Sequence, residues 1–143
     1  MYSYNIRIKN KKTILALGAE SAGNFSVFFP SLSPLAKGGS EGGCIYFSED
    51  FGDLLEDANF HKFENELNKF FKKENIKPDV ILTDFHPLYR TTLLGEKLAK
   101  KYSAKGGSAF GGKAKHVKVQ HHIAHIFSAV GEYLIKEKTP PLL

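Results

Sequence analysis

The chain has 143 residues and a formal net charge of +5, and 42% of its residues are hydrophobic, so its composition suits one folded domain rather than a disordered chain. A single cysteine, Cys44, excludes an internal disulfide and a multi-cysteine zinc site. No apolar run approaches the roughly 20 residues of a membrane-spanning helix. The N-terminus lacks the apolar core of a signal peptide. We therefore expect a cytoplasmic, soluble protein without a membrane partner.

Three short apolar runs in the first third of the chain predict β-strands. They are Thr13–Leu17, Asn24–Phe29 and Cys44–Ser48, and turn-forming residues separate them. Three strands in succession favour an antiparallel meander. The stretch 31–43 is rich in Ser, Pro and Gly, so we predict a long loop between the second and third strands.

The remainder of the chain alternates helices with strands. The first helix is predicted from apolar residues at helical spacing and should end near Asn75. Its apolar positions are Phe60, Phe63, Leu67, Phe70 and Phe71. A strand is predicted next at Val80–Thr83, and then a helix marked by Leu94, Leu98 and Tyr102. A Gly-rich surface loop at 105–112, a strand at Val117–Val119 and a helix from His121 complete the predicted order. The order β-β-β-α-β-α-β-α predicts a single α/β domain over residues 1–143. It is the order of a ribonuclease-H-like or actin-like (ASKHA) half domain, in which helices pack on a mixed sheet.

Polar residues follow the predicted parallel strands at the point where ligands bind in such sheets. Three segments lie there: Gly18–Asn24, Asp84–His86 and Gln120–His122. Asp84 and His86 allow two interpretations, a catalytic or ligand-binding role, or a structural one. In the structural interpretation Asp84 caps the next helix and His86 bonds to the backbone.

His121 and His125 form the sharpest motif, because residues four apart share one helix face and can offer two imidazoles to one metal ion. At about 100° per residue, the apolar positions of this helix fall roughly 140° to 240° from His121. Those positions are Ile126, Phe127, Val130 and Leu134. The pair therefore faces away from the apolar stripe and is predicted to bind metal rather than to belong to the core. A third ligand would come from Asp84, His86 or residues that this chain lacks.

Seven lysines gather in the C-terminal half of the chain. They are Lys97, Lys100, Lys101, Lys105, Lys113, Lys115 and Lys118. They fit a solvated helix face that runs into a basic loop, or a site for phosphates or an acidic partner. The sequence has no RNP, KH or zinc-finger signature, so nucleic acid is not the expected partner.

Four motifs occur in the order seen in one family: ALGAE (16–20), FGDL (51–54), TDFHPLY (83–89) and VQHHIAHI (119–126). Together they resemble the Kae1-like domain of the HypF-type hydrogenase maturation carbamoyltransferases, in its N-terminal lobe. The resemblance covers about Thr13 to Leu134. The helix motif is also similar to that of the universal tRNA threonylcarbamoyl-adenosine proteins.

The resemblance implies that His121 and His125 bind iron or zinc. It implies that Gly18, Ala19, Glu20 and Asn24 form the turn that meets nucleotide, as ATP or carbamoyl-adenylate with magnesium. From their own position after the buried strand, and not from the resemblance, Asp84 and His86 are the candidates for the catalytic role. The family enzyme passes a carbamoyl group from carbamoyl-adenylate to a C-terminal cysteine of the partner HypE, where it becomes the cyanide ligand of the nickel–iron centre.

The sequence departs from the family pattern after the GAE turn, where Ser21, Ala22 and Gly23 replace the usual Lys and Asn. The family's later Asp-Gly-Thr-Gly strand and its second actin-like lobe do not occur in this sequence. We therefore expect a fragment, a truncated relative or one half of a split protein that does not complete the reaction alone. Its partner would be a HypE-like acceptor, the missing lobe or a second copy in a homodimer. The alternatives are a non-catalytic ribonuclease-H-like binding or assembly module, or a relative of the tRNA-modifying proteins.

Overall fold

A computed structural model describes residues 2–6, 10–30, 43–103 and 113–136 of the chain. Its strands are β1 (Tyr2–Ile6), β2 (Ile14–Leu17), β3 (Phe25–Phe29), β4 (Gly43–Phe47), β5 (Val80–Asp84) and β6 (Lys115–Val119). Its helices are α1 (Asp57–Lys73), α2 (Arg90–Ser103) and α3 (His121–Lys136), and a short 3₁₀ turn, η1, spans Glu20–Ala22. The predicted loop around 31–43 and the Gly-rich stretch 105–112 lie outside the described residues, except that Gly43 already belongs to β4.

All six strands form one mixed sheet in the order β1-β4-β3-β2-β5-β6. The pairs β2–β3 and β3–β4 are antiparallel, which confirms the predicted meander. The pairs β2–β5 and β5–β6 are parallel, as helix–strand alternation requires. The predicted element order needs one correction, because β1 precedes the meander and pairs antiparallel with β4 at the edge of the sheet. Its pairing partner lies about forty residues away, so its short alternating sequence did not indicate it.

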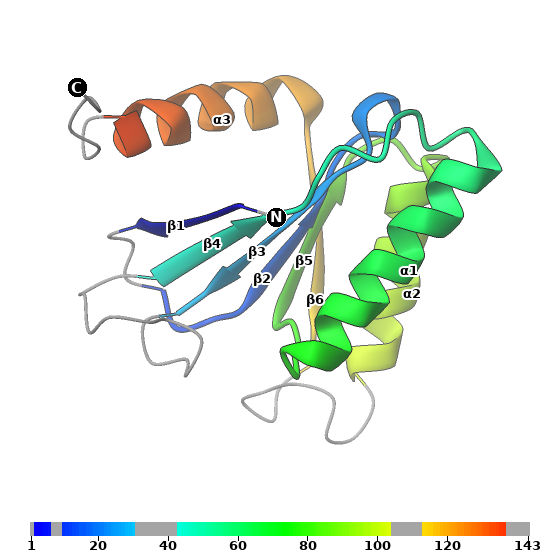
Figure 1. Cartoon of the computed structure of the whole chain (residues 1–143), viewed down its shortest axis with the longest axis horizontal. Coiled ribbons are helices and arrows are strands. Elements are labelled where there is room, and N and C mark those ends of the chain that lie inside the picture. Colours follow the sequence, from blue (N-terminus) through cyan, green and yellow to red (C-terminus); the bar gives the residue numbers. More distant parts are fainter. Residues whose placement is uncertain (1, 7–9, 31–42, 104–112, 137–143) are drawn as a thin grey trace.

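One face of the sheet packs against α1 and α2 and holds the hydrophobic core (Figure 1). Leu15, Val27 and Ile81 point to this face from three neighbouring strands and are fully buried. Phe25 contacts the rings of Phe51, Phe63 and Phe70, which ties β3 to α1 and to the segment before it. The predicted apolar stripe of α1 is therefore core, and the helix ends at Lys73, two residues before Asn75.

Among the described helices, α3 alone lies above the opposite face of the sheet (Figure 1). Many of the strand residues on this face are apolar and only partly buried; among them are Ile14, Ala16, Val80, Leu82, Val117 and Val119. The residues of α3 from His121 to Val130 are all exposed, and Phe127 is 69% exposed. The predicted apolar stripe of this helix is therefore not buried at Ile126, Phe127 and Val130, while the side chain of Leu134 lies outside the described residues.

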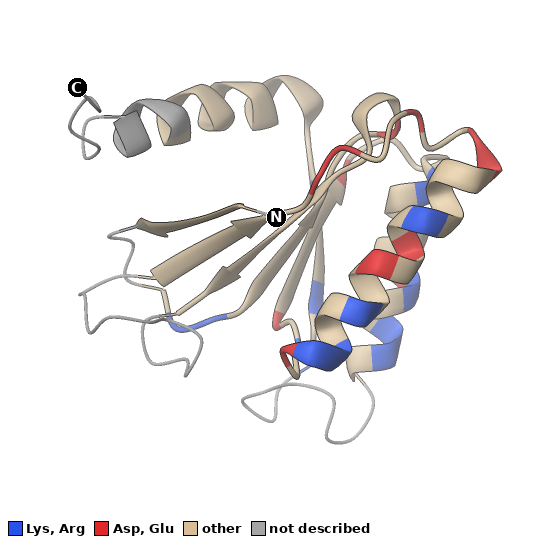
Figure 2. Cartoon of the chain, viewed as in Figure 1, with Lys and Arg blue, Asp and Glu red and all other residues tan. Residues whose placement is uncertain are grey.

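Charged residues are also distributed unequally between the elements on the two faces of the sheet. Figure 2 shows the Lys, Arg, Asp and Glu residues mainly on α1, α2 and the connecting loops. Strands β1 to β4 and the residues of α3 from 121 to 131 contain none of these four residue types. Of the helices in the described part of the chain, none is long and apolar enough to cross a membrane.

Candidate functional site

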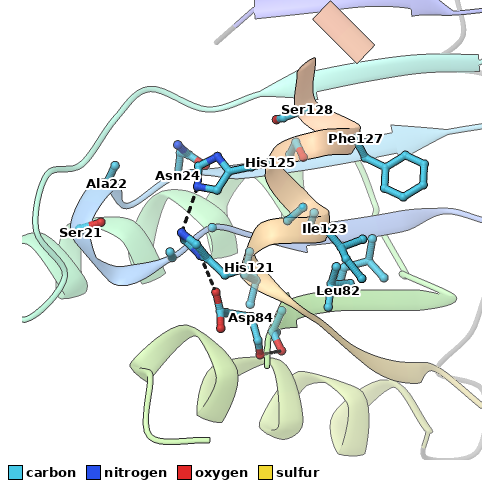
Figure 3. A pocket seen from close by; sticks show the side chains of 18 residues that line it. Ser21, Ala22, Asn24, Leu82, Asp84, His121, Ile123, His125, Phe127 and Ser128 are labelled. Carbon is cyan, nitrogen blue, oxygen red and sulfur yellow. Dashed lines mark hydrogen bonds and ion pairs between the residues drawn. The ribbon is translucent and has the colours of Figure 1, made fainter. Parts of the chain in front are cut away.

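A pocket of about 710 Å³ lies between α3 and the edge of the sheet where β2, β5 and β6 end (Figure 3). Pockets of this volume commonly hold small molecules and cofactors. The lining comes from three segments that are far apart in sequence, within 16–26, 82–84 and 119–128. The sequence-predicted site residues Gly18, Ala19, Asn24, Asp84, His121 and His125 all belong to it. The three strand ends predicted to meet at one edge therefore do so, although His122 is not part of the lining.

The turn after β2 lies on one side of the pocket. Its two ends are joined by a hydrogen bond from the Gly18 N–H to the Asn24 carbonyl oxygen, at 2.8 Å. A Cβ atom at position 18 would lie 2.7 Å from the Asn24 Oδ1 and 3.0 Å from the Asn24 carbonyl oxygen, so a larger residue there would displace the Asn24 side chain. The turn therefore offers small side chains and the Asn24 amide to the pocket, rather than bulky groups.

Asp84 ends β5, and its side chain is 11% exposed. Its Oδ1 accepts a hydrogen bond from the His86 N–H at 2.9 Å, and its Oδ2 lies 3.0 Å from the His121 Nδ1. Burial raises the pKa of the Asp84 carboxyl, but the His86 N–H bond and the contact with His121 outweigh it. The net pKa lies below the ordinary value of 3.8, so Asp84 is a carboxylate at neutral pH.

His121 and His125 lie in the first two turns of α3, and their rings are in edge-to-face contact with centroids 4.6 Å apart, on one side of the helix as the sequence spacing predicts. The two Nε2 atoms are 3.0 Å apart. Figure 3 shows His121 between Asp84 and His125, so the three side chains form one chain of contacts. Two imidazole nitrogens at this separation can bind one cation, because a typical metal–nitrogen bond is about 2.1 Å long. Among the described residues, no group of three or more His, Cys, Asp or Glu could hold a metal ion.

Two of the sequence-predicted site residues lie outside the lining. Glu20 is 9% exposed, and its Oε1 accepts a hydrogen bond from the Arg90 N–H, so its carboxylate caps α2. His86 stacks on Tyr89, with ring centroids 4.4 Å apart, and its Nδ1 accepts a hydrogen bond from the Leu88 N–H. His86 thus makes the backbone bond of its structural interpretation, and Glu20, not Asp84, accepts the hydrogen bond from the first residue of α2.

The pocket also contains residues that the sequence did not single out. Three are hydroxyl side chains, Ser21, Ser26 and Ser128, and two are the exposed apolar side chains Ile123 and Phe127 of α3. At about 100° per residue Ile123 lies roughly 200° from His121, on the side of the apolar stripe, so the helix phase gave no signal that it lines the pocket beside the histidines. Phe127 was assigned to the apolar stripe, and its place in the pocket follows only from the position of α3 above the sheet.

Comparisons with known proteins agree with this geometry. The model of the family described as the HypF Kae1-like domain matches residues 9–132. A protein named "Probable carbamoyltransferase HypF" from Methanocaldococcus jannaschii is 27% identical over 128 residues, which are 89% of this chain and 14% of that protein. A crystal structure of full-length HypF in the phosphate- and nucleotide-bound form matches with a TM-score of 0.64. At 22% identity, over 92% of this chain and 17% of that one, it shows the shared fold.

The chain thus spans a small part of the length of both relatives. The family match, by contrast, covers most of the chain and includes every segment that lines the pocket. The motifs that follow β2, β5 and β6 and the sheet that brings them together have the same explanation: this chain belongs to the HypF Kae1-like domain family.

Proposed function

We propose that this chain is the part of a HypF-type carbamoyltransferase, in nickel–iron hydrogenase maturation, that binds an adenine nucleotide beside a metal ion. In the proposed reaction a carbamoyl group passes from carbamoyl-adenylate to a cysteine sulfur of a HypE-like acceptor protein, and AMP leaves. The observation that carries the proposal is the convergence of the Gly18–Asn24 turn, Asp84 and the histidine pair on one pocket. The names of the two relatives, a carbamoyltransferase and a nucleotide-bound HypF, support it.

The histidine pair suits iron or zinc, because both metals accept neutral imidazole nitrogen. His121 and His125 would hold the ion through their Nε2 atoms, which already lie 3.0 Å apart at the edge of the pocket. When bound, the ion would supply positive charge to a phosphate or carbamoyl oxygen. Water and substrate oxygens would fill its other positions.

The charge of the pocket favours such an ion. Its lining contains the carboxylate of Asp84 but no lysine or arginine. A nucleotide phosphate would therefore meet no fixed positive side chain there, and a cation beside His121 and His125 would balance its charge. The small residues of the 18–24 turn leave room for the phosphate, and the apolar side chains of Ile123 and Phe127 offer a surface for a base or ribose.

Metal content tests the histidine pair directly. We expect the purified chain to bind about one iron or zinc ion, measured by mass spectrometry, and the His121→Ala/His125→Ala double variant to lose it. His122→Ala is the matched control, because His122 is a neighbouring exposed histidine outside the lining. Equal metal content in the wild type and the double variant would contradict the assignment.

A non-catalytic binding or assembly module is the second candidate, favoured by the exposed apolar residues Ile126 and Val130 of α3. A homodimer, a HypE-like protein or a second lobe would be the partner of such a module. Titration with ATP by calorimetry separates the two functions, because the enzyme lobe should bind ATP and Asn24→Ala should weaken that binding. A chain that binds metal but no ATP would favour the assembly module.

A further inference from the structure

Both oxygens of the Asp84 carboxylate already have a partner within the protein. Oδ1 accepts from the His86 N–H at 2.9 Å, and Oδ2 contacts the His121 Nδ1 at 3.0 Å. The backbone of Asp84 is fixed as well, since the Thr83 and Thr92 hydroxyls each donate to its carbonyl oxygen at 3.2 Å. Asp84 is thus held in place from three sides, and its carboxylate is aimed at one nitrogen of one histidine.

The pattern of donors and acceptors determines where the proton of His121 lies. A carboxylate only accepts hydrogen bonds, so the His121 Nδ1 must be the donor in its contact with Asp84. A neutral imidazole carries one proton, and the His121 Nε2 is then left with a free electron pair. That electron pair faces the His125 Nε2, which must donate the proton of their 3.0 Å contact when no cation is present.

We propose that Asp84 is a positioning residue: it holds His121 in the tautomer protonated at Nδ1 and so presents the Nε2 electron pair to a cation shared with His125. It does not itself serve as a ligand. A carboxylate behind a metal-binding histidine fixes both the ring orientation and the tautomer, and loss of such a partner commonly weakens metal binding about 10- to 100-fold. The cation part of this inference rests on the proposed function, whereas the tautomer does not.

Asp84→Asn provides an isosteric test, because the neighbouring backbone determines how the amide sits. The His86 N–H needs an acceptor where Oδ1 now lies, so the amide oxygen should take that place. The NH₂ group then faces the His121 Nδ1 and donates to it, which makes Nδ1 an acceptor. His121 should therefore change to the tautomer protonated at Nε2, the nitrogen that the cation needs.

The tautomer is measured without metal, by long-range ¹H–¹⁵N NMR of the imidazole rings in the metal-free chain at mildly alkaline pH. The His121 signals are assigned by their loss in His121→Ala. We expect Nδ1 protonation in the wild type and in His86→Ala, which keeps its backbone N–H, and Nε2 protonation in Asp84→Asn. Asp84→Ala, which offers neither acceptor nor donor, should give a mixture. A wild-type His121 protonated at Nε2, or the wild-type pattern in Asp84→Asn or Asp84→Ala, would overturn the proposal.

Cobalt(II) titration, followed by calorimetry and by visible absorption, then measures the consequence. Asp84→Asn should bind cobalt about 10- to 100-fold more weakly than the wild type, with the absorption of its saturated complex unchanged. Unchanged affinity would contradict the positioning role, and an altered absorption spectrum at saturation would indicate that Asp84 is a ligand. A wild type that binds no cobalt would reject the metal site of the proposed function, while the NMR result would still decide the role of Asp84. Thermal unfolding of each variant checks that it folds.

Discussion

The two faces of the sheet are built from the same strands but differ in how they are covered. On the α1–α2 face, side chains such as Leu15, Val27 and Phe63 are fully buried and interlock with both helices. On the opposite face, α3 lies above half-buried strand residues and lines one side of a pocket of about 710 Å³. The buried core therefore lies on one face of the sheet, whereas the other face leaves an open pocket beside the histidine pair.

The largest expected effect compares two phenylalanines, one on each side of the sheet. Phe25→Ala removes a ring that is 2% exposed and contacts three other aromatic rings, so it should lower the free energy of unfolding by about 3–5 kcal/mol. Phe127→Ala removes a ring that is 69% exposed and should change it by about 0.5 kcal/mol or less. Urea denaturation measures both. Equal losses would mean that α3 packs on the sheet in solution and would break the comparison.

A second pair of variants places the same methyl group on α2 and on α3. A Cβ at Gly95 would lie 2.4 Å from the Thr83 Cγ2, so Gly95→Ala should destabilise the fold by about 1–3 kcal/mol. A Cβ at Gly131 meets nothing within 4 Å, and Gly131→Ala should stabilise the helix by up to about 1 kcal/mol. Opposite shifts of the urea midpoint are expected. Destabilisation by Gly131→Ala would show that another surface packs on α3.

The smallest effect concerns pH and a histidine on the packed face. Burial lowers the pKa of His116 below its ordinary value of 6.5, partly opposed by Glu96, and its Nε2 lies 2.8 Å from the Thr83 Oγ1. Below about pH 6.5 the His116 side chain binds a proton more readily in the unfolded chain than in the folded one. Its contribution to the free energy of unfolding is therefore complete above about pH 6.5 and falls as the pH drops. His116→Gln should lose less stability than the wild type between about pH 7 and pH 5. Parallel pH profiles of the unfolding free energy would contradict this assignment.

Most of the sheet could be predicted from the sequence because its strands are short apolar runs bounded by turn residues. The run at 14–17, for instance, lies at the centre of the sheet and is apolar on both faces, and its ends follow from Gly18 and Thr13. Strand β1 was missed because its five residues carry little signal of their own and are fixed by pairing with β4. The amphipathic pattern of α3 indicated a helix correctly, but periodicity cannot tell what covers its apolar side.

Some features of the candidate site could likewise be predicted from local sequence, whereas others depend on contacts between distant residues. That His121 and His125 share a helix face follows from the sequence alone, because a spacing of four residues is a local property of the helix. The segments that meet at one edge follow from it too, because parallel strands place their carboxyl ends together. The cap that Glu20 provides to α2 through Arg90, and the contact of Asp84 with His121, depend instead on the tertiary structure. Those partners lie 70 and 37 residues apart, and no local pattern encodes the direction of a side chain across such distances.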